Sequence, residues 1–266
     1  HLLLIYSGLV PGQRFETAQL SPPNPFSTNI VRTGDLNGDG LSDVVLSQLF
    51  GTSHDVPNKA WVIFGRTSFD APVKLEELDG ANGFIIESQS SDRRIAAWID
   101  IPGDVNGDGI DDLLLDRSTG NRTDPYDTLV VFGTVESFPA LLTDGDLDGS
   151  NGLVIDLPTE HARWYSVGGA GDFDGDGLTD FTAGGTLVFG SDSPFEVSST
   201  GLLTEAADRY RLDDLIPARA SGKLRATSAG DFNGDGFDDL ALHEQVDYTT
   251  SGSIFVVFGR RPDDVF

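Results

Sequence analysis

The sequence predicts an all-β fold made of four tandem units, and three observations support this prediction. An acidic pattern, Gly-Asp-x-(Asn/Asp)-Gly-Asp-Gly-x-x-Asp, occurs four times, with its first Asp at positions 35, 104, 172 and 231. A Phe-Gly pair follows each copy and ends at Gly65, Gly133, Gly190 and Gly259. Short apolar runs between turn residues fill the rest of the chain, without a helical period of useful length. Two markers in phase indicate repeated structural units of about 60–70 residues.

Each complete unit is expected to hold four short strands, with the acidic loop between the first two. In unit 1 the strands are predicted over 28–34, 43–48, 59–65 and 83–88, and in unit 2 over 95–102, 112–116, 127–132 and 152–156. Unit 3 is predicted to have strands over 164–170, 180–183, 186–189 and 209–213. Unit 4 has only three, over 224–230, 239–243 and 252–258, and two spare strands are expected over 2–6 and 14–20.

Radial stacking into a β-propeller is the economical way for such four-stranded antiparallel units to bury both faces. The 266 residues then form one domain, with closing strands in 1–27 and blades over 28–94, 95–160, 161–219 and 220–266. A ring of four blades, or of five with one built from both ends of the chain, fits the pattern. Phe64, Phe132, Phe189 and Phe258 are expected between blades, and Trp61, Trp98 and Trp164 in the core.

The acidic loops carry the chemistry of a calcium site. Oxygen side chains at positions 1, 3, 5 and 9 can converge if the chain curls tightly, and glycines at positions 4 and 6 permit that curl because they adopt positive φ. A flexible cage made only of oxygen ligands suits Ca²⁺ better than Mg²⁺ or Zn²⁺. The predicted side-chain ligands are Asp35, Asn37, Asp39, Asp43, Asp104, Asn106, Asp108, Asp112, Asp172, Asp174, Asp176, Asp180, Asp231, Asn233, Asp235 and Asp239.

These loops differ from EF-hand loops, which end in a bidentate Glu at position 12 and connect two helices. Here position 12 is Leu46, Leu115, Ala183 or Leu242, and a β-type run begins directly after position 9. The alternative, that four ordinary Asp-Gly turns bind nothing, leaves the carboxylate at position 9 without a role. A fifth acidic stretch, containing Asp144, Asp146 and Asp148, has Gly152 at its position 9. We therefore interpret that stretch as a turn leading into a strand and exclude it from the metal ligands.

The spacing of the acidic loops and the Phe-Gly pairs resembles that of the FG-GAP repeats of integrin alpha-subunit propellers. In style, the sequence is more similar to the integrin-like proteins of cyanobacteria. The resemblance covers nearly the whole chain from Ile30 onward. It implies a propeller with four Ca²⁺ sites, in which a backbone carbonyl at position 7 is a further ligand. Those carbonyls belong to Leu41, Ile110, Leu178 and Phe237. The Gly-Ala-Pro sequence that the family has after the second strand is not conserved in this chain, and integrins have seven blades. We therefore transfer only the fold and the metal binding from the family to this chain.

The composition excludes several classes of function. A net charge of −26 argues against nucleic acids and anionic membranes as partners, and no segment suits membrane insertion. The chain has no Cys, its four His show no metal-ligand spacing, and it has no nucleophile elbow or phosphate loop, so we expect no enzymatic activity.

Calcium sites of moderate affinity are filled outside cells, which predicts a secreted or cell-surface protein. An adhesion or ligand-binding module for an extracellular protein or glycan fits best. A propeller domain of a secreted polysaccharide- or lipid-processing enzyme, or a structural segment of a surface protein, is the alternative, and the oligomeric state is open.

Overall fold

The computed structural model describes residues 27–49, 59–67, 73–90, 93–118, 127–155, 167–198, 202–203, 209–212, 214–216, 223–245 and 252–261. It confirms the all-β prediction, because these residues form four mainly antiparallel sheets and two short 3-10 turns. The strands predicted over 2–6 and 14–20 lie outside the described residues, as does Trp164. None of the helices in the described ranges is long and apolar enough to cross a membrane.

The first two sheets follow the predicted strands within one or two residues. Sheet 1 contains β1 (Ser27–Gly34), β2 (Asp43–Leu49), β3 (Lys59–Ile63), β4 (Gly83–Glu87) and β8 (Leu141–Thr143), in that order. Sheet 2 contains β5 (Arg94–Gly103), β6 (Asp112–Ser118), β7 (Asp127–Val131) and β9 (Gly152–Ile155). The 3-10 turns η1 (Leu75–Glu77) and η2 (Asp144–Asp146) precede β4 and β9.

The last two sheets repeat this antiparallel order. Sheet 3 contains β10 (Gly168–Gly171), β11 (Asp180–Ala183), β12 (Thr186–Val188) and β13 (Arg209–Arg211). Sheet 4 contains β14 (Lys223–Gly230), β15 (Asp239–Gln245) and β16 (Ile254–Val257). The described part of unit 4 thus has three strands, as the sequence predicted, and β16 is the outermost of them.

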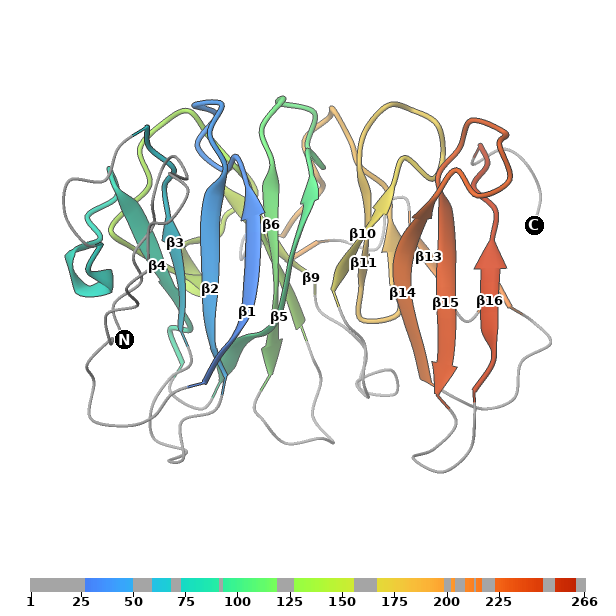
Figure 1. Cartoon of the computed structure of the whole chain (residues 1–266), viewed down its shortest axis with the longest axis horizontal. Helices are drawn as coiled ribbons and strands as arrows, with labels where there is room; N and C mark the ends of the chain where they lie inside the picture. The colour runs from blue at the N-terminus through green and yellow to red at the C-terminus, as the bar shows by residue number, and fades with distance from the viewer. Residues whose placement is uncertain are drawn as a thin grey trace, which may run out of the picture.

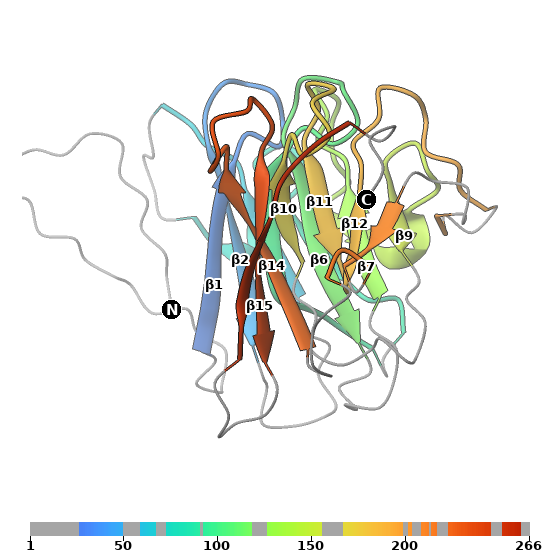
Figure 2. The same cartoon turned by 90° about the vertical axis from the view of Figure 1, so that its right-hand side faces the viewer.

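The four sheets stand side by side, and their first strands are neighbours in the order β1, β5, β10 and β14 (Figure 1). Each first strand leads up into an acidic loop and each second strand leads down from it, so all four acidic loops lie at the same end of the molecule (Figures 1 and 2). Within the described ranges the sheet order is not closed, because sheets 1 and 4 lie at opposite ends of the array in Figure 1.

Apolar side chains fill the spaces between neighbouring sheets. Phe64 packs between sheets 1 and 2, Phe132 between sheets 2 and 3, and Phe189 between sheets 3 and 4, all buried as predicted. The prediction for Phe258 is wrong, because 49% of this residue is exposed. The physical reason is that no described sheet lies beyond sheet 4, so the equivalent surface has nothing to pack against.

Strand β8 was not predicted. It extends sheet 1 by pairing parallel to β4, although it comes from unit 2. A parallel bridge between Val154 and Leu202 links units 2 and 3 in the same way. The short, half-exposed sequence Leu141–Thr143 carries little strand signal of its own, and its strand conformation depends on the neighbouring edge.

Trp98 also departs from the sequence-based expectation. It lies in β5, where the register shifts between Ile95 and Ile99 and where Ala96 has a φ of 64°. The irregular strand leaves Trp98 39% exposed, with the Arg225 guanidinium 5.1 Å from the centre of its ring. Trp98 is therefore not a core residue, whereas Trp61 in β3 is partly buried against the apolar cluster on the outer face of sheet 1.

Candidate metal centre

The four acidic loops share one backbone conformation. The glycines at positions 4 and 6 all have positive φ, as predicted: 68° and 82° in loop 1, 78° and 86° in loop 2, 77° and 94° in loop 3, and 78° and 96° in loop 4. These values lie in the left-handed region, where a Cβ atom is strained. The repeated curl therefore follows from the sequence itself.

Each curl gathers the side chains of positions 1, 3 and 5. In loop 1 the Asp35 carboxylate accepts the N–H groups of Asp39 at 3.1 Å and Gly40 at 2.8 Å. The Asn37 side-chain oxygen accepts the Asp39 N–H at 3.0 Å, and Asp39 accepts the Leu41 N–H at 2.8 Å. Loops 2 and 4 repeat these bonds with their own residues. The structure thus brings three of the four predicted side-chain positions together in each loop.

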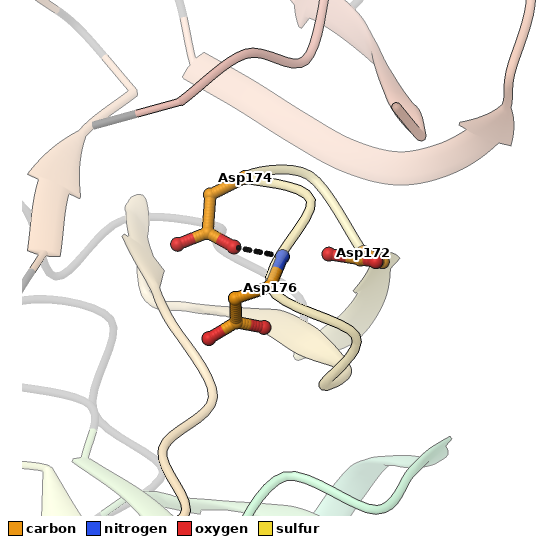
Figure 3. A group of neighbouring side chains, drawn as sticks. All are labelled: Asp172, Asp174 and Asp176. Carbon is orange, nitrogen blue, oxygen red and sulfur yellow. Dashed lines mark hydrogen bonds between the residues drawn. The ribbon is translucent and has the colours of Figure 1, made fainter. Parts of the chain in front are cut away.

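Loop 3 differs because its position 3 is Asp174 instead of Asn. One oxygen each from Asp172, Asp174 and Asp176 lies within 4.8 Å of the others, and Figure 3 shows the three side chains around the curl. Asp174 accepts the Asp176 N–H at 3.1 Å. Burial, and then the charge of Asp176, raises the pKa of Asp174. Three carboxylates this close repel one another unless a cation or protons neutralise them.

The donor set of loop 3 fits a calcium ion. Asp172 Oδ2 accepts the Gly177 N–H at 3.0 Å, but the buried Asp172 Oδ1 has no hydrogen-bond partner. A buried carboxylate oxygen without a partner is costly, and a divalent cation would satisfy it. All side-chain donors are oxygens, which is the ligand type that Ca²⁺ prefers. The position-7 carbonyls, among them that of Leu178, remain predicted ligands.

The position-9 carboxylates occupy a different place. Asp43, Asp112, Asp180 and Asp239 are fully buried at the start of the second strand of each sheet. Each accepts an N–H group from position 2 of its loop and one from the glycine of the Phe-Gly pair, and Asp180 and Asp239 also accept the position-3 N–H at 3.3 and 3.2 Å. In loop 3 the first two donors are Phe173 at 2.7 Å and Gly190 at 2.9 Å, and the other three loops repeat this pair.

Position 9 therefore connects the two sequence markers. The hydrogen bonds to these two markers give the position-9 carboxylate a role in the fold, which was not predicted from the sequence, beside its predicted role as a metal ligand. A Cβ added at Gly133 would lie 2.3 Å from the Asp111 carbonyl oxygen, and one at Gly259 would lie 2.2 Å from that of Asp238. Only glycine allows this close approach. The regular alternation of acidic loop and Phe-Gly pair, with position 9 and the glycine 10–22 residues apart, was the signal that could have revealed the contact.

Burial strongly changes the ionisation of position 9. It raises the pKa of Asp43 to about 6 and the pKa values of Asp112 and Asp180 to about 8, although the two N–H donors act in the opposite direction. Neighbouring loop carboxylates raise these pKa values further. A bound cation would favour the ionised form.

The fifth acidic stretch has separate protein partners. Asp144 accepts hydrogen bonds from Ser88 at 3.0 Å, the Gln89 N–H at 2.7 Å and Arg117 at 2.7 Å. Asp146 caps η2 together with Thr143, and Asp148 accepts bonds from Ser150 in the turn before β9. The three carboxylates thus serve a buried ion-pair network and two local turns, which fits the interpretation of this stretch as a turn leading into a strand.

Comparison with known proteins adds one family. Residues 224–257 match the family model described as FG-GAP repeat. A search of curated proteins found no match to the chain. The matched segment spans almost all of sheet 4, including its acidic loop and β16 up to Val257. Because the same loop and the same contact between position 9 and the Phe-Gly glycine recur in sheets 1, 2 and 3, the match confirms the resemblance drawn from the sequence. Residues 224–257 are thus similar to an FG-GAP repeat, and the other three sheets share their loop and its contact with the Phe-Gly glycine.

Proposed function

We propose that the chain is a calcium-binding β-propeller module that acts outside the cell, as an adhesion or ligand-binding unit and not as an enzyme. The four sheets are its blades, and each acidic loop holds one Ca²⁺. The FG-GAP match supports the propeller, because repeats of this family form integrin-like propellers. The loop geometry supports the metal, and extracellular calcium levels support the location.

One observation carries the calcium proposal. In loop 3 three carboxylates converge and one buried oxygen, Asp172 Oδ1, lacks a protein partner. The other loops have the same backbone curl and the same set of oxygen donors, with an Asn amide in place of one carboxylate. The ligands would be the side chains at positions 1, 3, 5 and 9 and the carbonyl at position 7. Bound Ca²⁺ would supply positive charge that offsets the repulsion between carboxylates.

The proposed role of the metal is structural, because each of the first three loops also forms part of the joint to the next sheet. The Asp35 carbonyl accepts the Asp111 N–H at 3.2 Å, and the Asp172 carbonyl accepts the Asp238 N–H at 3.0 Å. A cation that fixes position 1 of a loop would therefore fix the start of the neighbouring second strand. Calcium would stabilise the contact between blades as well as the loop.

Calcium removal tests this role. Ligand at about 100 times its dissociation constant adds about 2.7 kcal/mol per site, so four independent sites add at most about 11 kcal/mol. A domain typically has about 5–15 kcal/mol of total stability. We therefore expect a chelator to lower the melting temperature strongly at fixed pH and salt, and calcium but not magnesium to restore it. An unchanged melting temperature would refute the structural role.

The binding role rests on the shape of such modules, which present loops at the end opposite the metal sites. The sequence predicts such loops between the second and third strands of units 1, 2 and 4, and their residues His54, Arg122, Tyr126 and Tyr248 lie outside the described residues. Arrays of extracellular glycans and matrix proteins, screened at fixed calcium concentration, test the proposal. Saturable, calcium-dependent binding supports it. Turnover of a polysaccharide or lipid, in place of binding, would contradict it.

A further inference from the structure

The three joints between neighbouring sheets use one repeated set of contacts. The N–H at position 8 of each following loop donates to the position-1 carbonyl of the preceding loop. The N–H of the residue after the Phe-Gly pair donates to the position-2 carbonyl of the same preceding loop. These second bonds join Thr134 to Leu36 at 3.0 Å, Ser191 to Val105 at 2.9 Å and Arg260 to Phe173 at 2.8 Å.

Apolar burial accompanies the hydrogen bonds at every joint. The position-2 side chains Leu36, Val105 and Phe173 are each no more than 1% exposed. On the following sheet, the facing residues are fully buried as well, for example Leu113, Leu115 and Leu240. A joint thus has an accepting side, with two carbonyls and the position-2 side chain, and a donating side, with two N–H groups and an apolar strand face.

Sheet 4 presents an accepting side that no described sheet covers. Phe232, at position 2, is 69% exposed, and Ile254, Val256 and Phe258 are 75%, 37% and 49% exposed. Ala241 is paired with Val256 and so lies on the same face. None of these five side chains carries a negative charge, although the net charge of the chain is −26. The exposed His243 lies on this face too, as the partner of Ile254. A group of exposed apolar side chains of this kind on an acidic protein marks an interaction surface.

Sheet 1 presents the matching donating side. Ser42 is its position-8 residue and stands where Asp111, Thr179 and Asp238 stand at the three internal joints. Its Val44 and Trp61 are only partly buried, whereas the equivalent Leu113 and Leu129 are fully buried at the first joint. Val73, Leu75 and Leu78 cover the rest of this face, where Leu46 and Ile63 are buried at 4% and 0% exposure. Among the described residues, no sheet precedes it.

We propose that two copies of this chain associate head to tail, with sheet 4 of one copy packed on sheet 1 of the other in the register of the internal joints. The Ser42 N–H would donate to the Asp231 carbonyl, and the Ser42 hydroxyl would accept the Asp231 N–H, as the Asp111 carboxylate accepts the Asp35 N–H at 2.8 Å. Val44 and Trp61 would cover the exposed face around Phe232. Two such joints would close two chains of four sheets into one ring of eight, within the range of about 4–8 blades known for propellers.

Each joint pairs two different surfaces, sheet 4 of one copy with sheet 1 of the other, and the two joints of the dimer are related by a two-fold axis. Substitutions on either surface should therefore weaken the dimer. We expect the full chain in calcium to sediment at twice its 28.4 kDa mass. Phe232→Ser with Ile254→Ser should weaken dimerisation at least about tenfold, since exposed apolar anchors dominate such interfaces. Val135→Ser is the matched control, because Val135 is equally exposed, at 75%, but lies outside this face. Melting curves of each variant verify folding.

Variants of the first sheet complete the test. Val44→Ser should also yield monomers, although Val44 lies in sheet 1 and the residues substituted above lie in sheet 4. Mixing this variant with the Phe232→Ser, Ile254→Ser variant leaves one intact joint per pair, so dimers should reappear. A monomeric wild-type protein at all concentrations would overturn the proposal, and so would a Val44→Ser variant that folds and still dimerises fully, since that result indicates contact between two fourth sheets.

Discussion

Loops 3 and 4 have the same motif but different surroundings. In both loops the position-6 glycine donates to the position-1 carboxylate at 3.0 Å, and the position-5 carboxylate accepts the position-7 N–H. Yet Phe173 at position 2 of loop 3 is fully buried, whereas Phe232 at position 2 of loop 4 is 69% exposed. The motif therefore determines the curl, and the neighbouring sheet determines the burial.

A second difference between the two loops concerns charge. Position 3 is Asp174 in loop 3 and Asn233 in loop 4, and the Asn233 amide donates to the Asp235 carboxylate at 2.7 Å. This donor offsets part of the repulsion that loop 3 retains between Asp174 and Asp176. Loop 3 has more negative charge among its predicted ligands, and we therefore expect it to be the more calcium-dependent of the two loops.

The largest contrast is expected from removing the position-2 phenylalanines. Phe173→Ala should lower the free energy of unfolding by about 3–5 kcal/mol, because it leaves a cavity between sheets 3 and 4. Phe232→Ala should change it by about 0.5 kcal/mol or less when the protein is dilute enough to be monomeric. Denaturant unfolding in calcium measures both. Equal losses would show that loops 3 and 4 are equally covered in solution.

A pH series without calcium should show the cost of the buried position-9 carboxylates. Their folded-state pKa values are raised from 3.8 to about 6 for Asp43 and about 8 for Asp112 and Asp180. The protonated carboxyl groups contribute their full stability at pH values below the pKa of the unfolded state. This contribution is lost as the pH rises through the pKa of the folded state. Each group contributes up to about 1.4 kcal/mol per pH unit in that window.

The melting temperature in chelator should therefore rise as the pH falls from 8 to 6. Calcium should reverse this trend, because protons then compete with the metal for the same oxygens. Asp180→Asn is the control, since an amide at that position cannot titrate and should make the chelator curve less steep, while Asp112 still titrates. A metal-free protein that loses stability over this fall in pH would contradict the raised pKa values.

Substitutions at position 5 distinguish the effect of metal binding from that of packing, because the side chain at this position is exposed in both loops. Asp176→Ala and Asp235→Ala should each cost about 2–3 kcal/mol in saturating calcium, the contribution of one lost site. In chelator the same variants should melt close to the unsubstituted protein. Thermal unfolding with and without calcium gives the comparison. A loss of equal size under both conditions would assign Asp176 a purely structural role.

The smallest expected effect comes from exchanging position 3 between the loops. Asp174→Asn should raise the metal-free stability by about 0.5–1.5 kcal/mol, because it removes one of three converging carboxylates. Asn233→Asp should lower it by a similar amount. Calcium titrations followed by calorimetry should show weaker binding to the first variant and tighter binding to the second. Shifts of the same sign in both variants would refute the charge explanation.

Much of the fold followed from the sequence because its signals are local. The glycines at positions 4 and 6 and the apolar runs after position 9 determine the loops and second strands wherever they occur. Strand β8, the exposure of Trp98 and that of Phe258 did not follow, because each depends on what lies beside the element. The connection from Asp180 to Gly190 could have been inferred from the alternation of the two markers in every unit, but the hydrogen bond itself required the fold.

The number of calcium ions bound per chain tests the central claim most directly. We expect native mass spectrometry, or elemental analysis after dialysis against millimolar calcium, to find four ions per chain. The Asp176→Ala and Asp235→Ala variants should each bind three. A chain that remains folded in millimolar calcium without bound metal would contradict the account, because the converging carboxylates of the acidic loops would then be left without their proposed cation.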